Sequence, residues 1–178
     1  MPRLLSILVA ALLGAVSLCA TSLEKLSMEQ LVDRSTAIVQ GRVLSSYCMQ
    51  RGPVIYTNFR LQVAKIHKGS APQALEISVP GGQINGLRQS FSGTPRLEAG
   101  SEYVVFVWTS KSGIHHTIGL AQGVFDVKTL ANGQVLLTRG AIDALMLDPN
   151  GKEAEDKGFS LTLGRLAELV RASEARSR

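Results

Sequence analysis

The stretch IYTNFRLQVAKIH, residues 55–67, predicts the longest β-strand of the chain. Apolar and polar side chains alternate along it, so one face carries Thr57, Phe59, Leu61 and Val63, and the opposite face carries Asn58, Arg60 and Gln62. A period of two over this length is typical of a half-buried strand. Lys68-Gly69-Ser70 ends the strand with residues that favour a turn.

The segments around this stretch also predict strands. Residues 37–47 alternate imperfectly and contain Gly41, which indicates a bulge or sharp coiling. A turn or loop is expected at residues 49–53. Residues 103–108 (YVVFVW) are apolar on both faces, which predicts a central strand covered on both sides. Further strands are expected at residues 75–79, 117–120 and 123–128. The turn Asn132-Gly133 should pair the last of these with residues 134–138 in a hairpin. Residues 141–147 fit a strand or an irregular segment.

Two short helices flank the strands. Ser27 followed by Gln30 predicts a capping box at the start of the first helix, which should end near Ser35. Thr162 is the expected N-cap of the second helix, close to the C-terminus. Leucines precede and follow both caps at the positions of a hydrophobic staple.

Five to seven strands with few helices predict a mainly β fold. We expect a single antiparallel, partly open OB-like barrel with short N-terminal and C-terminal helices. The two long adjacent strands, one with an interior glycine, favour this coiled barrel over the alternative, a β-sandwich.

Residues 1–22 have the pattern of a secretory signal peptide. Arg3 supplies a positive charge, residues 4–16 are apolar, and small residues follow, so we expect cleavage after Ser22 or, alternatively, after Ala20. Residues 23–178 then form one domain of a secreted or periplasmic protein with no transmembrane segment. Cys19 allows an alternative, a lipid anchor to the cell envelope, although the bulky Leu18 before it is unusual for such a site.

The cysteines limit the disulfides that the chain can form, and the charged residues indicate how it interacts with solvent. If Cys19 leaves with the signal, Cys48 is the only cysteine, so no intrachain disulfide forms and Cys48 is expected to be a small buried side chain or an intermolecular bridge. The chain has 19 Lys and Arg against 14 Asp and Glu, a net charge of +5, and the basic residues are scattered. Scattered positive charge mainly favours solubility.

The sequence contains none of the common catalytic motifs for metalloproteases, serine hydrolases or nucleotide binding. His115 and His116 are adjacent, so on a strand they point to opposite faces and cannot chelate one metal ion together. We therefore expect no metal, no cofactor and no enzymatic activity. The alternative is a hydrolase with an unrecognised site that uses His67, His115 or His116 as acid–base groups.

Residues 80–95 (PGGQINGLRQSFSGTP) form a long Gly- and Ser-rich segment between two predicted strands. Loops of this length are usually functional or loosely ordered, so it is either a binding loop or a connector. The side chains that can bind a peptide backbone, a glycan or a phosphate are Gln83, Asn85, Arg88 and Gln89, with Phe91 as a further contact or an anchor to the barrel.

A family resemblance supports the barrel. Residues 36–69, 75–82 and 100–107 resemble a group of exported bacterial proteins without an established activity. Their strand pattern is also similar to the netrin-like modules of tissue inhibitors of metalloproteinases, which are OB barrels. In those inhibitors a Cys-x-Cys start chelates the protease zinc, whereas here Thr21 stands two residues after Cys19, which speaks against this mode of inhibition.

The preferred hypothesis is an exported, non-enzymatic binding module that recognises an extracytoplasmic protein or glycan through residues 80–95. A protein inhibitor of an extracellular protease is an alternative. Nucleic acid is not expected as a partner, because aromatic residues are only 5% of the chain and export removes the protein from nucleic acids. The oligomeric state stays open.

Overall fold

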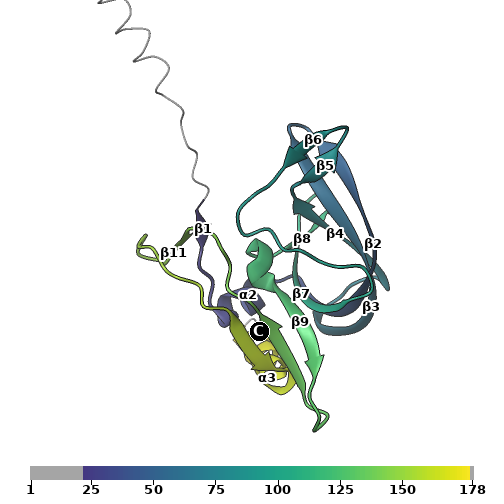
Figure 1. Cartoon of the computed structure of the whole chain (residues 1–178). Helices are drawn as coiled ribbons and strands as arrows, with labels where there is room; N and C mark the ends of the chain where they lie inside the picture. The colour runs from purple at the N-terminus through teal and green to yellow at the C-terminus, as the bar shows by residue number, and fades with distance from the viewer. Residues whose placement is uncertain (1–21, 177–178) are drawn as a thin grey trace, which may run out of the picture.

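The computed structural model describes residues 22–176 (Figure 1). Five strands form a partly closed ring: β2 (Ala37–Arg51), β3 (Val54–Gly69), β4 (Ala74–Pro80), β8 (His115–Thr117) and β7 (Glu102–Thr109), with β7 pairing back to β2. All neighbours are antiparallel except β4 and β8, which meet in parallel at a single residue pair. The predicted mainly β, partly open OB-like barrel is therefore confirmed.

The sheet continues beyond the barrel. β7 also pairs with β9 (Val124–Thr129), which pairs with β10 (Val135–Arg139) and then β12 (Phe159–Thr162). Two helices pack together beside this extension, α2 (Met28–Arg34) and α3 (Leu163–Arg176). Both predicted helices are confirmed, and Ser27 and Gln30 form the reciprocal hydrogen bonds of a capping box.

Smaller elements complete the fold. β1 (Leu23–Glu24) pairs in parallel with β11 (Met146–Leu147), and η1 (Leu120–Gly123) is a short 3₁₀ helix before β9. β5 (Gly82–Ile84) and β6 (Leu87–Gln89) form a separate hairpin, which lies at the end of the barrel in Figure 1. No helix within residues 22–176 has both the length and the apolar character needed to cross a membrane.

The core consists of two hydrophobic clusters that share β2 and β7. Val105 and Val107 face the barrel interior, whereas Val104 and Phe106 face the cluster under the helices. Neighbouring residues of a strand point to opposite faces, so β7 supplies both clusters in alternation. This arrangement confirms the prediction of a strand covered on both sides and gives its physical reason.

Three local predictions were wrong. Residues 49–51 belong to β2, and only Gly52-Pro53 forms the turn, because Gly52 adopts a positive φ of 58° that permits a two-residue connection. The strand predicted at residues 117–120 lies earlier, at β8, and Leu120 begins η1. The segment 80–95 is not one long loop, since β5 and β6 lie within it.

The irregularity predicted at Gly41 is present. The register between β2 and β3 shifts at Gln40/Gly41. A Cβ atom at Gly41 would lie 2.6 Å from the carbonyl oxygen of Gln62, so no other residue fits without movement of the backbone. The bulge coils the two long strands sharply enough for the sheet to close into a barrel.

Candidate functional site

The chain between β4 and β7 builds the candidate site around the β5–β6 hairpin. Asn85 and Gly86 form its turn, both with positive φ (50° and 78°). Asn-Gly is the strongest short-range signal for a two-residue hairpin, and it was present in the sequence but missed. Leu87 at the turn is 64% exposed, so the tip of the hairpin projects into solvent.

Gln89 fixes the hairpin to the barrel. Its Oε1 accepts a hydrogen bond from the backbone N–H of Ile55 at 2.7 Å, and its Nε2 donates to the carbonyl of Pro53 at 2.8 Å. The side-chain amide thus takes the place of a strand neighbour for the start of β3. Gln89 was predicted as a ligand-binding side chain, but its amide is already used by the protein and acts as an anchor.

Two further contacts make the base of the hairpin rigid. The Thr57 hydroxyl donates to the carbonyl of Gly81 at 2.8 Å, and the Gly81 N–H donates to the carbonyl of Ile55 at 2.7 Å. Gly82 has a φ of +141°, and a Cβ there would lie 2.8 Å from Cys48 Sγ. The half-buried Cys48 is therefore a packing partner of the hairpin within the described chain.

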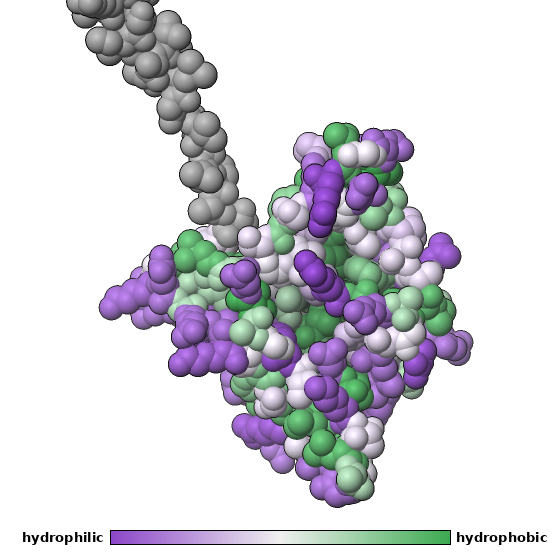
Figure 2. All heavy atoms as spheres, in the orientation of Figure 1, coloured by the Kyte–Doolittle hydropathy of each residue, from purple (hydrophilic) through white to green (hydrophobic). Residues whose placement is uncertain are grey.

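A groove of about 650 Å³ lies between the hairpin and the open end of the barrel. Its floor is apolar because Phe59, Val79 and Leu97 of the barrel interior reach it. Figure 2 shows this hollowed face, with hydrophobic surface at the bottom and hydrophilic side chains at the rim. The residues predicted from the sequence that line the groove are Gln83, Arg88, Gln89 and Phe91, whereas Asn85 lies outside it in the hairpin turn.

A second cavity of about 430 Å³ continues the groove along the molecule. Both cavities are lined by Phe91, Thr94, Pro95 and Arg96. Tyr103, Asp126 and Arg139 line only the second cavity. Phe91, predicted as a contact or an anchor, is half-buried at the junction of the two spaces. Together they form one elongated groove, called here the 80–97 groove.

Arg88 and Arg96 give this groove its charge. Both side chains are exposed, and neither guanidinium has a hydrogen bond or ion pair to another described residue. Unpaired guanidinium groups beside an apolar floor are well suited to bind carboxylates in a bidentate manner. Arg96 was missed because it lies one residue beyond the Gly- and Ser-rich segment that defined the prediction.

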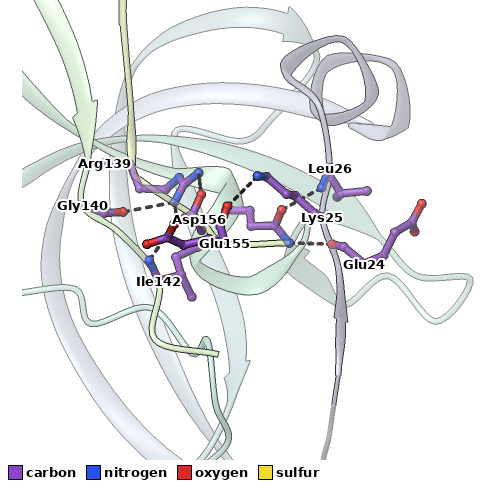
Figure 3. Close-up of polar contacts among 9 residues, drawn as sticks. Glu24, Lys25, Leu26, Arg139, Gly140, Ile142, Glu155 and Asp156 are labelled. Carbon is purple, nitrogen blue, oxygen red and sulfur yellow. Dashed lines mark hydrogen bonds and ion pairs between the residues drawn. The ribbon is translucent and has the colours of Figure 1, made fainter. Parts of the chain in front are cut away.

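The wall of the second cavity is held by a buried ion pair (Figure 3). Arg139 donates to both carboxylate oxygens of Asp156, at 2.5 and 3.0 Å, and their side chains are only 11% and 6% exposed. The backbone N–H of Ile142 donates to the same carboxylate at 2.8 Å. The pair therefore fastens the segment after β10 to the loop before β12 and shapes the groove.

The three histidines occupy two places. His67 is hydrogen-bonded to Gln40, a β2 residue paired with Val104 near the start of β7. His115 is hydrogen-bonded through Nδ1 to Thr109, the last residue of β7, so the two histidines lie at opposite ends of that strand. Burial lowers the pKa of His67, with Lys65 adding to the effect, and burial followed by the charge of His116 lowers the pKa of His115. The hydrolase alternative stays a prediction.

Within residues 22–176, no group of three His, Cys, Asp or Glu side chains is arranged to hold an ion. Cys19, the predicted lipidation site, lies outside the described residues. Comparison with models of known protein families gave no match, and comparison with curated proteins gave none either. The site must therefore be interpreted from its own geometry.

Proposed function

We propose that this protein is an exported, non-enzymatic binding module that holds a segment of an extracytoplasmic protein in the 80–97 groove. The observation that carries the proposal is the combination of three apolar floor residues with two unpaired arginines, Arg88 on the hairpin that the barrel holds and Arg96 in the segment that follows it. A preformed groove loses little conformational entropy when its ligand binds.

The lining favours a protein segment over a glycan. The floor consists of Phe59, Val79 and Leu97, which are 1–8% exposed and present small apolar patches rather than an open aromatic surface. Such patches accept apolar side chains, and Arg88 and Arg96 accept acidic ones. The expected partner segment therefore carries apolar residues next to Asp or Glu.

Charge reversal combined with photo-crosslinking tests this proposal. A benzoylphenylalanine in place of Phe91 should crosslink a defined protein from the extracytoplasmic fraction, whereas the same group in place of Leu130, an exposed residue of the β9–β10 turn, should not. Adding Arg88→Glu and Arg96→Glu should abolish the crosslink. The matched control, Lys128→Glu with Arg171→Glu, makes the same charge change on exposed residues elsewhere and should leave it intact.

Two results would count against a groove for proteins. Equal crosslinking from both positions would show that the contact is non-specific. Capture of a glycan in place of a protein, lost in the double arginine variant, would assign the groove to the alternative ligand class. If the captured protein is a protease whose activity the purified chain reduces, the inhibitor alternative is the correct form of the proposal.

Export is part of the proposal and has its own test. Mass spectrometry of the mature protein should give Leu23 as the first residue, after removal of residues 1–22. A diacylglyceryl group on Cys19 would instead assign the protein to the cell envelope. An unprocessed N-terminus in the exporting cell would contradict both.

A further inference from the structure

Trp108, the only tryptophan of the chain, is unusually exposed for its position. It belongs to the central strand β7, where Val104 to Val107 are at most 1% exposed, yet 46% of Trp108 is accessible. Its indole N–H has no partner among the described residues. Trp108 therefore presents apolar ring surface and an unpaired N–H donor to solvent at the end of a buried strand.

The orientation of the Trp108 indole is fixed by a neighbouring ring. It stacks on His116 with ring centroids 5.7 Å apart and an angle of 28° between the planes. His116 is itself held, because its Nδ1 donates to the carbonyl of Ser78 at 3.0 Å and its ring centroid lies 6.4 Å from that of Tyr56. The indole is therefore preoriented, with one face covered by His116.

The exposed part of Trp108 lines a cavity of about 540 Å³. This volume lies within the range of about 300–1,000 Å³ that is usual for small-molecule sites. Ile118, Leu23 and Leu26 supply the remaining apolar surface. The cavity is distinct from the 80–97 groove, since the two have no lining residue in common.

A planar polar pair lines the same cavity. Arg34 donates two hydrogen bonds to the two carboxylate oxygens of Glu24, at 2.7 and 2.8 Å, and both side chains stay about half exposed. The bonds from Arg34 hold the pKa of Glu24 below its usual value, so the acceptor stays ionised at neutral pH. The remaining N–H groups of Arg34 and lone pairs of Glu24 thus offer donors and acceptors side by side.

Charge balance limits the class of ligand. The side chains of the cavity lining include one cation and one anion, which already neutralise each other, and the third polar side chain, Gln122, uses both ends of its amide on the backbone of Glu24 and Leu26. Phosphate-bearing ligands would find no unpaired cationic side chain here, unlike in the 80–97 groove. The ligand should therefore be neutral, with one flat apolar face and a rim of hydroxyl groups.

We propose that this cavity binds one ring of a neutral saccharide. The C–H face of a pyranose ring packs on the exposed indole of Trp108, and adjacent hydroxyl groups bond to Arg34 and Glu24. Aromatic rings supply such a contact area at low entropic cost, and the indole N–H provides one more donor. This site is independent of the proposed groove and does not rest on the proposed function.

The single tryptophan provides a direct assay. A panel of uncharged mono- to tetrasaccharides of glucose, galactose, mannose and N-acetylglucosamine is titrated into the protein, with calorimetry to confirm binding. At least one member should shift the Trp108 emission in a saturable manner. Trp108→Ala should abolish the binding heat, and Glu24→Gln or Arg34→Lys should weaken binding at least tenfold.

Controls separate this site from the groove and from loss of folding. The double variant Arg88→Glu with Arg96→Glu, which alters the groove, should leave saccharide affinity unchanged. Arg171→Lys, the control for Arg34→Lys, should also leave it unchanged. Trp108→Phe should keep the fold and part of the affinity, with far-ultraviolet circular dichroism as the check on folding. The proposal is overturned if no member of the panel binds, if binding persists in Trp108→Ala, or if only sulfated or phosphorylated sugars bind.

Discussion

Replacement of Asp156 by Asn tests how the wall of the 80–97 groove is held. Three N–H groups converge on the carboxylate, two from Arg139 and one from Ile142, at 2.5 to 3.0 Å. An amide has only one acceptor oxygen, so the substitution leaves at least one donor facing an NH₂ group and leaves Arg139 as a buried unpaired cation. Breaking such a pair costs about 3–5 kcal/mol of unfolding free energy.

Urea unfolding followed by Trp108 emission measures this loss. At pH 7 the midpoint should fall by about 1.5–2.5 M, given a urea m value of about 2 kcal/mol/M. Asp143→Asn is the matched control, because Asp143 is exposed and has no partner among the described residues, and it should change the midpoint by less than about 0.3 M.

The pH dependence of unfolding tests independently whether the ionised Asp156 carboxylate stabilises the fold. Burial alone raises the pKa of Asp156, but the hydrogen bonds from Arg139 and Ile142 and the charge of Arg139 outweigh it, so the pKa lies below its usual value. A carboxyl group of this kind stabilises the fold above its unfolded pKa of about 3.9, and the contribution is lost as the pH falls through the folded value. The advantage of wild type over Asp156→Asn should therefore be complete at pH 7 and shrink below about pH 4. A difference under about 1 kcal/mol at pH 7, or one that stays constant down to pH 3, would refute this reasoning.

Three further substitutions have defined outcomes. Gln122→Ala removes the acceptor for the Leu26 N–H and the donor to the Glu24 carbonyl, both at 2.9 Å, so it should cost about 2–5 kcal/mol in urea unfolding and speed amide exchange at Leu26. Gly82→Ala should lower the unfolding free energy by more than about 1 kcal/mol and weaken binding in the groove, because the new Cβ contacts Cys48 and the backbone has a positive φ. Gly133→Ala also has a positive φ but no neighbouring atoms, so its loss of unfolding free energy measures the backbone strain alone. Ser27→Ala should lower the thermal midpoint through a loss of about 0.5–2 kcal/mol, whereas Ser27→Gly should lose only a few tenths.

Elements with a local signal could be predicted from the sequence. The alternation around Phe59 and Leu61 gave β3, and the spacing of Ser27 and Gln30 gave the start of α2. In both cases the pattern that marks the element lies within a few residues of the chain. Closure of the barrel followed from two long coiled strands and the bulge at Gly41.

Elements stabilised by distant partners could not be predicted in this way. β12 was missed because the alternation of residues 159–162 is only four residues long and runs directly into the cap of α3, so pairing with β10 is what makes this segment a strand. The last residues of β2, up to Arg51, are partly exposed and follow the preceding segment without alternation, so pairing with β3 is what extends them. Tertiary context decided both cases.

The role of Gln89 in the structure differs from the ligand-binding role predicted for it. A glutamine in a Gly-rich segment looks like a free ligand group, and nothing local shows that Gln89 bonds to Ile55, 34 residues earlier. Gln122 makes an equivalent contact with Leu26, from which it is 96 residues away in the chain. In each case the side-chain amide satisfies backbone groups of a segment far away in the chain. Such roles depend on the three-dimensional neighbour and leave no trace in spacing.

The two proposed sites lie at opposite ends of β7. Tyr103 lines the second cavity of the 80–97 groove, and Trp108 lines the saccharide cavity. At about 3.3 Å per residue the strand separates them by roughly 17 Å. The residues between them, Val104 to Val107, are at most 1% exposed and pack into both core clusters. A strand packed on both faces is stiff, so occupancy of one end should not alter the other, and the two binding free energies should add within about 0.5 kcal/mol.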